Sequence, residues 1–302
     1  MLSKEKIRKY NAEVIARISA FMNYNSDFIT SDIIDELVNE CGVDRKYAFS
    51  VVLASACYMN IDEDEEDREM FEYYFPEMIH YIKKEDYEND LYYKNIKVTP
   101  VKEGDWEFRE AVIKPYELIP LDDLKELPDG RIIPQVAFFD CEFPYPVILQ
   151  GGVEWMLVTP NEVETMKEAI EKAHGKVATY GLGLGYFPYM TSVMDSVDSV
   201  TVVELDENVI DIFKRFILPQ FPRGDKVRIV HADAFEYAEK TAPSEKFDYI
   251  YADTWHDPSD GVDMYLRFKA LEHLCPHTEF EYWIEKTMKH YLPKEKQWQN
   301  CV

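Results

Sequence analysis

The chain has few basic residues for its length. Of its 302 residues, 33 are lysine or arginine and 58 are aspartate or glutamate, which gives a formal net charge of −25. Nucleic-acid-binding proteins rely on clusters of lysine and arginine against the phosphates, so we expect no nucleic-acid partner. The acidic balance is compatible with a cationic substrate, and equally with the solubility that a high net charge provides.

Long apolar segments are also lacking. The N-terminus, residues 1–6, has no apolar core of the signal-peptide kind. The longest weakly polar run, residues 48–59, is much shorter than the ~20 residues that span a bilayer. It is more typical of a buried helix, and we expect a cytoplasmic protein with no membrane partner.

Cysteine pairs with metal or redox spacing are absent from the sequence. The five cysteines are scattered and include no CxxC pair, which indicates reduced thiols. His273, Cys275 and His277 lie close together, but a proline interrupts them and no fourth ligand lies at a suitable distance, so we expect no metal site. The sequence also has no serine nucleophile elbow and no Walker phosphate loop.

Hydrophobic periodicity divides the chain into three segments. Residues 1–95 are predicted to form a helical N-terminal domain, in which the acidic run 62–67 is a solvated loop or a helix start rather than a cation site. Residues 96–158 are rich in β-formers and predict a connector that ends in a hairpin. Residues 159–302 alternate strands with helices, which is typical of a parallel sheet covered by helices on both faces.

The third segment begins with a clear helix start. Thr159 as N-cap, Pro160 at the first helical position and Glu162 as the capping-box glutamate together predict a helix. Strands are expected at 177–181, 200–205, 227–231 and 248–252, with a fifth at 280–284. The sequence shows no evident antiparallel pair after these, so the edge of the sheet would need another cover.

The strand at 177–181 runs directly into a glycine-rich turn. Gly181, Gly183 and Gly185 alternate with leucines, and glycine lets the backbone come close to a ligand because no Cβ blocks the approach. A tight strand-to-helix turn would explain the same pattern. Glu204 follows about twenty residues on, where an acidic residue typically holds a ribose diol. Tyr186 stands where a dinucleotide site needs glycine or alanine, so the turn suits S-adenosylmethionine better.

Two further strand ends carry polar side chains. Asp233 and Ala234 follow the strand at 227–231 and are placed to bind an adenine ring, although Asp233 is also a preferred helix N-cap. Asp253, His256 and Asp257 follow the strand at 248–252 in a loop that also holds Trp255. These groups could position a nucleophile, accept its proton and stack on a flat or cationic substrate. The alternative is a loop of turn formers with one packed tryptophan.

Together these motifs resemble the class I S-adenosylmethionine-dependent methyltransferase superfamily, and within it the spermidine-synthase-like branch. The resemblance covers residues 147–257. The motifs that carry it are GLGLG (181–185), VTVVELDENVI (200–210), HADAFEY (231–237) and FDYIYAD (247–253).

The resemblance implies a ligand position for each matching residue. Gly181, Gly183 and Gly185 would face the methionine part of S-adenosylmethionine, and Glu204 would hold the ribose hydroxyls. Asp233 and Ala234 would hold the adenine. Asp253 would lie nearest the reacting carbon, with His256 or Asp257 orienting the acceptor or taking its proton. The implied fold is an α/β, Rossmann-like class I methyltransferase sheet, from which this chain departs because the last antiparallel strands have no evident counterpart in its sequence.

Some residues depart from the aminopropyltransferase pattern. Leu184 stands where these enzymes typically carry an aspartate inside the glycine loop, and His256 stands where a second carboxylate usually follows. The sequence therefore favours methyl transfer to a small molecule or a protein side chain. Aminopropyl transfer to a polyamine is one alternative, and a catalytically degenerate nucleoside-binding or assembly module is another. A homo-oligomer is one way in which the open edge of the sheet could be covered.

Overall fold

The structure is a computed structural model that describes residues 2–292. It divides into two compact units, and each is described by itself. Of the described residues, the N-terminal unit comprises 2–88 and 112–145, and the C-terminal unit comprises 89–111 and 146–292. The segment 96–158, predicted as one β-rich connector, therefore contributes to both units. Within residues 2–292, no helix is both long and apolar enough to cross a bilayer.

Helices dominate the N-terminal unit. Its longest helix, α1, has Ser3 as its N-cap, and α4 has Asp64, whose carboxylate accepts from the backbone of Glu66 and Asp67. The acidic run 62–67 thus contains a helix start. The helices of this unit are α1 (Lys4–Asn25), α2 (Ser31–Cys41), α3 (Arg45–Ala56), α4 (Glu65–Met78) and α5 (Lys84–Glu88).

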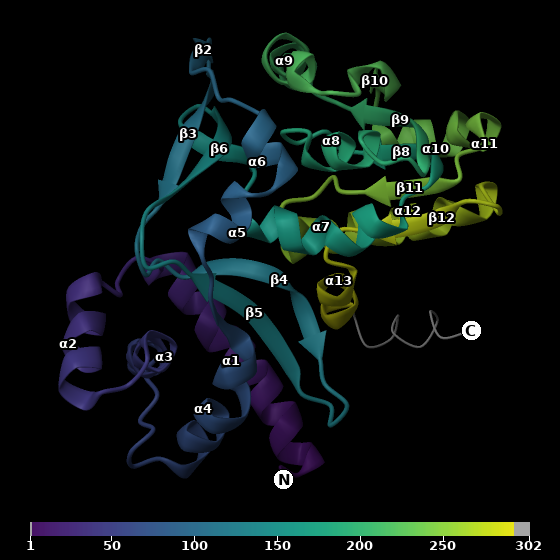
Figure 1. Cartoon of the computed structure of the whole chain (residues 1–302). Helices are drawn as coiled ribbons and strands as arrows, with labels where there is room; N and C mark the ends of the chain where they lie inside the picture. Colours follow the sequence, from purple (N-terminus) through teal and green to yellow (C-terminus); the bar gives the residue numbers. More distant parts are fainter. Residues whose placement is uncertain (1, 293–302) are drawn as a thin grey trace. The chain divides into compact units, whose positions relative to one another are not determined.

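The N-terminal unit is not purely helical, which corrects the prediction for residues 1–95. A three-stranded sheet has the order β1-β5-β4, made of β1 (Ile79–Tyr81), β4 (Ile119–Glu126) and β5 (Ile132–Phe138). β1 pairs in parallel with β5. Its three residues are too short for an alternating pattern to reveal it. Helices α1 and α4 pack against β5 (Figure 1). Aromatic residues such as Phe49 and Phe138, whose rings stack, belong to the hydrophobic core of this unit.

The C-terminal unit begins with an antiparallel sheet of order β2-β3-β6-β7. The predicted hairpin forms between β6 and β7, with its turn at Gly151 and Gly152. Phe108 and Ile148 of this sheet join the hydrophobic core of the unit. The short elements are α6 (Leu91–Asn95), β2 (Val101–Glu103), β3 (Trp106–Ile113), β6 (Phe143–Gln150) and β7 (Val153–Leu157).

A five-stranded parallel sheet forms the centre of the C-terminal unit. Its order is β10-β9-β8-β11-β12, and every neighbouring pair is parallel. Numbered along the chain this is 3-2-1-4-5, the order of a doubly wound Rossmann-like sheet. The strands are β8 (Gly175–Tyr180), β9 (Val197–Glu204), β10 (Val227–His231), β11 (Tyr249–Ala252) and β12 (Glu279–Tyr282).

Alternating residues of the strands pack on opposite faces. Val177 and Tyr251 pack in one hydrophobic cluster with residues of α7, α8 and α9, and Ala178 and Ile250 pack in another with residues of α10, α12 and α13. Helices therefore cover both faces (Figure 1). These helices are α7 (Pro160–Lys172), α8 (Tyr186–Ser192), α9 (Glu207–Ile212), α10 (Ala234–Lys240), α11 (Ala242–Glu245), α12 (Pro258–Leu271) and α13 (Glu285–Tyr291).

The predicted strands of this unit and the fold class are confirmed. The α7 capping box also forms, with the Thr159 N–H donating to Glu162 Oε2 at 2.8 Å. Among residues 2–292 the sheet contains the five parallel strands and no antiparallel pair after β12.

Candidate active site at the switch point of the sheet

The order of the strands reverses between β8 and β11, and ligands of doubly wound sheets bind at the carboxyl ends of the strands at such a point. The glycine loop follows β8, and Asp253 follows β11. The two strand ends are joined directly, because the Asp253 N–H donates to the Tyr180 carbonyl at 2.9 Å. The chain thus brings together two motifs that lie about seventy residues apart in the sequence.

The three glycines of the loop have different neighbours, although all have positive φ angles. A Cβ on Gly181 would lie 1.9 Å from the Asp253 carbonyl oxygen, and a Cβ on Gly185 would lie 2.3 Å from the Phe213 ring. A Cβ on Gly183 would meet nothing within 4 Å. Gly181 and Gly185 are therefore required by packing inside the protein, and Gly183 is the glycine of the three with open space in front of it.

Glu204 fastens the glycine loop to the end of β9. The residue is 8% exposed, and its carboxylate Oε2 accepts from the Leu182 N–H at 3.0 Å. Oε1 accepts from the backbone N–H groups of Leu205 and Asp206, each at 2.8 Å. A buried carboxylate that accepts three backbone hydrogen bonds fixes the loop in place. The sequence places Glu204 at the site but does not reveal this structural role.

Asp233 is the N-cap of α10, which is the alternative that the sequence left open. Its Oδ1 accepts from the backbone of Phe235 and Glu236, both at 2.9 Å. Ala234 is the first residue of that helix. The cap engages one carboxylate oxygen, so a second role for Asp233 in adenine binding stays a prediction.

Asp253 is a carboxylate with few partners. Its side chain is partly exposed, and within residues 2–292 no group donates a hydrogen bond to it. Burial first, and the nearby carboxylate of Glu162 second, raise the pKa of Asp253 to about 8. A carboxylic acid that titrates near neutral pH can exchange a proton with a bound substrate.

Glu162 is a second carboxylate of this site that sequence reasoning identified only as a capping residue. Burial raises its pKa, against the hydrogen bonds that it accepts from the backbone and hydroxyl of Thr159. Its influence on Asp253 depends on α7 packing beside β11 in the fold. No local sequence pattern contains that information.

Two residues of the loop after Asp253, Trp255 and Asp257, are engaged in packing and helix capping. Asp257 is the N-cap of α12 and accepts from the Ser259 N–H, so it is engaged in a capping box with Asp260. Trp255 is only 4% exposed, and its ring lies against Gly261, so it is buried rather than poised to stack on a substrate. This corrects the sequence expectation, because indole packing is favoured over exposure when a helix start provides a small neighbour.

His256 remains exposed beside this helix start. Its Nδ1 lies 3.0 Å from Asp260 Oδ2, and its ring meets that of Trp155 edge-on at 4.9 Å between centroids. Burial acts to raise the pKa of Asp260, but hydrogen bonds from the His256 side chain and the backbone of residues 256 and 257 lower it overall. Sequence reasoning missed Asp260 and Trp155. The spacing Asp257-Pro258-Ser259-Asp260 was the signal for the first of them.

Leu184, which replaces the aspartate typical of the aminopropyltransferase glycine loop, is buried in the structure. Its side chain is 2% exposed, and its carbonyl accepts from the Tyr92 hydroxyl at 2.6 Å. The loop therefore presents a buried apolar residue at the position where an acidic side chain was expected by resemblance. A cationic group bound there would have to find its counter-charge elsewhere.

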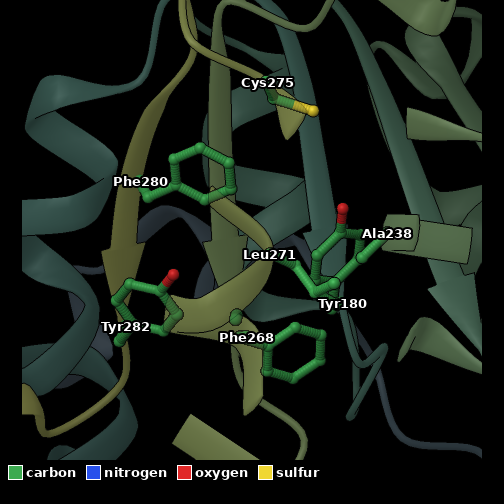
Figure 2. A pocket seen from close by; sticks show the side chains of 8 residues that line it. Tyr180, Ala238, Phe268, Leu271, Cys275, Phe280 and Tyr282 are labelled. Carbon is green, nitrogen blue, oxygen red and sulfur yellow. The ribbon is translucent and has the colours of Figure 1, made fainter. Parts of the chain in front are cut away.

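A small pocket in the C-terminal unit is lined by other residues, among them Tyr180 and Ala252 at the ends of β8 and β11. It is lined by apolar and aromatic side chains of β8, β11, β12, α10 and α12, and its free volume is about 10 Å³, room for about one water molecule. Figure 2 shows the Tyr180 hydroxyl directed to the side of the pocket where Cys275 lies. That hydroxyl is buried and has no hydrogen-bond partner within residues 2–292. The pocket suits a water molecule and not a nucleoside.

Comparison with known protein families gives a match to part of the chain. Residues 188–270 match the family described as the spermine/spermidine synthase domain, a little over a quarter of the chain. The matched region includes Glu204, Asp233, Asp253, His256 and Asp257. No curated protein matches the sequence.

Solved structures with partial similarity include spermidine synthases. One from Thermotoga maritima is 18% identical, with a TM-score of 0.33, and the match covers 61% of this chain and 55% of that one. A spermidine synthase in complex with the transition state analogue AdoDATO is 20% identical, with a TM-score of 0.35, and the match covers 62% of this chain and 57% of that one. The chain thus spans little more than half of either protein, and at these TM-scores the likeness carries no further weight. Over residues 188–270, the chain is similar to the spermine/spermidine synthase domain.

Proposed function

We propose that this protein is a transferase that moves an aminopropyl group from decarboxylated S-adenosylmethionine to an amine. The observation that carries the proposal is the carboxylate of Asp253, which has no hydrogen-bond partner in residues 2–292 and lies at the switch point of the sheet. It also lies inside the region similar to the spermine/spermidine synthase domain. This choice replaces the methyl transfer favoured from the sequence.

The residues at the switch point fit an adenosyl ligand without a pyrophosphate. Gly183 leaves open space for close approach, and Glu204 Oε2 accepts only one hydrogen bond, so it retains a lone pair for a ribose hydroxyl. Asp233 has an oxygen that the helix cap does not use. These three residues would hold the nucleoside.

The acceptor amine must lose a proton before it can act as a nucleophile. When bound, decarboxylated S-adenosylmethionine supplies an electrophilic propyl carbon next to a sulfonium. Asp253 would hold the acceptor as an ammonium ion and take one proton from it. The freed nitrogen lone pair forms a bond to that carbon, the carbon–sulfur bond breaks, and methylthioadenosine leaves with the electron pair. In-line alignment and exclusion of water contribute most of the acceleration.

Methyl transfer from S-adenosylmethionine is the second candidate. Leu184 favours it, since the loop has a buried leucine in place of the aspartate typical of aminopropyltransferases. In that case Asp253, with His256 beside it, would orient a different acceptor and take its proton.

A turnover assay tests the proposal. The purified protein is incubated with decarboxylated S-adenosylmethionine and putrescine, or with S-adenosylmethionine and the same amine, and products are identified by mass spectrometry. Methylthioadenosine formed with putrescine, and lost in Asp253→Asn, is the expected result. S-adenosylhomocysteine in the second reaction would instead favour methyl transfer, and a folded protein that makes no methylthioadenosine would contradict the aminopropyl proposal.

A further inference from the structure

The N-terminal unit contains a pocket that the proposed chemistry does not use. It lies between the first turns of α3 and the body of α4, with the loop before α4 closing one end. Its volume is about 540 Å³, within the range of about 300–1,000 Å³ that is usual for small-molecule sites. All its lining residues belong to the N-terminal unit.

Aromatic rings form the apolar part of this α3–α4 pocket. Tyr47 and Phe71 meet edge-to-face, with centroids 6.0 Å apart, and Phe71 lies 5.0 Å from Phe75. Phe75 is buried, whereas Tyr47 is 48% exposed. Such rings present π-faces that bind apolar groups and attract cations.

The two cations of the pocket already donate to backbone carbonyl groups. Lys46 Nζ donates to the Pro76 carbonyl at 2.9 Å. Arg68 Nε donates to the Ile61 carbonyl at 2.9 Å, and its Nη2 donates to the Asp62 carbonyl. Both side chains therefore stabilise the walls of the pocket, and part of their capacity to bind an anion is occupied.

The carboxylates of the pocket are less engaged. Those of Asp62 and Glu72 have no hydrogen bond or ion pair within residues 2–292, while Asp44 accepts from the Tyr47 N–H. Pro76 has no N–H, so the helical hydrogen bond to the Glu72 carbonyl cannot form. Glu72 thus combines a free carboxylate with an acceptor released from the helix. With three carboxylates against two cations, the lining is net negative.

We propose that the α3–α4 pocket binds a small organic cation, an amine whose ammonium group pairs with Glu72 and Asp62 and whose aromatic or alkyl body packs on Tyr47 and Phe71. An anionic ligand would face the free carboxylates and is disfavoured. The site lies in the other unit from the switch point, so it does not depend on the transferase proposal.

Three probes of one shape test the site. The full-length protein, labelled with ¹⁵N, is titrated with phenethylamine, 2-phenylethanol or phenylacetate, and amide shifts of residues 44–50 and 68–76 are followed. Phenethylamine is expected to bind with a dissociation constant on the order of 1 mM. The alcohol should bind about threefold to fivefold more weakly, as for loss of one exposed ion pair. Tighter binding of phenylacetate, or no saturable shift with phenethylamine, would overturn the proposal.

Matched variants distinguish the effect of losing the Glu72 charge from an effect on folding. Glu72→Gln should weaken phenethylamine binding about threefold to fivefold and leave 2-phenylethanol unaffected. Glu40→Gln, an exposed glutamate of α2 outside the pocket, is the control and should change neither. Thermal unfolding confirms that each variant is folded. Equal loss of amine and alcohol binding in Glu72→Gln would contradict the role of its charge.

Discussion

The carboxyl ends of β9 and β11 each carry a carboxylate side chain, but only the one at β9 accepts hydrogen bonds within residues 2–292. Glu204 accepts three backbone hydrogen bonds and fastens the glycine loop. Asp253 accepts none within residues 2–292, and its pKa is raised to about 8. The carboxylate at the end of β9 therefore stabilises the local backbone, whereas the carboxylate after β11 is suited to exchange a proton.

The glycine loop connects these two strand ends, and changes there should have the largest effect. Gly181→Ala would place a Cβ 1.9 Å from the Asp253 carbonyl oxygen at a φ of +97°. We expect a loss of about 3–5 kcal/mol in the free energy of unfolding, because backbone must move. Gly183→Ala is the control and should cost only about 1–2 kcal/mol, from its left-handed φ alone. Urea unfolding measures both, and equal losses would refute the distinction.

Glu204→Ala should lower the stability of the protein, because this carboxylate holds the glycine loop at the end of β9. One buried and two partly buried backbone N–H groups would lose their acceptor, and we expect a cost of about 2–4 kcal/mol. Glu204→Gln retains one carbonyl oxygen and should cost less, about 1–2 kcal/mol. Thermal unfolding of the two variants side by side measures the difference. A fully stable Glu204→Ala would show that the loop does not need this clamp.

Asp253→Asn should have the opposite effect to Glu204→Ala: it should reduce turnover and leave the fold intact. Turnover is expected to fall by at least about 100-fold, as for loss of a general base. In the wild type the rate should rise with pH through about 8, as the carboxylate ionises. A pH–rate profile with no inflection between 7 and 9 would argue against Asp253 as the base.

The same raised pKa predicts how stability depends on pH. Between the unfolded pKa near 4 and the folded pKa of about 8, the folded protein holds a proton that the unfolded chain has released. This group therefore makes the protein less stable as pH rises through that window. Asp253→Asn removes the group, so the decline in unfolding free energy from pH 5 to pH 8 should be shallower in the variant. An identical slope would place the pKa elsewhere.

His256→Ala should have the smallest effect. Its pairing with Asp260 is largely exposed, with side chains 56% and 37% accessible, so we expect a stability change within about 1 kcal/mol. Asp260→Asn tests the same contact from the other side. If His256→Ala lowered turnover as much as Asp253→Asn, the histidine would be the principal base instead.

The strands and helix starts of the parallel sheet could be predicted because their signals are local. β8 and β9 are apolar runs, and α7 begins with an N-cap, a proline and a capping-box glutamate. The topology brings Gly183, Glu204 and Asp253 to one edge, as the motif order indicates. Their roles toward a ligand stay predictions.

The remaining features depend on tertiary contacts or on very short segments. Glu162 affects Asp253 only because α7 packs on the sheet, and Trp255 is buried only because Gly261 leaves room for its ring. The strand β1 has three residues, too few for a period to be seen. No pattern within a single segment contains this information.

Calorimetric titration is the most direct test of a nucleoside site at the switch point of the sheet. Decarboxylated S-adenosylmethionine and S-adenosylmethionine are added separately to the wild type and to Glu204→Gln. We predict that the decarboxylated ligand binds more tightly to the wild type, because the carboxylate of Glu204 repels a ligand carboxylate. The affinity should fall in Glu204→Gln. Absence of binding heat with either ligand, from protein shown to be folded, would contradict a nucleoside site at the switch point.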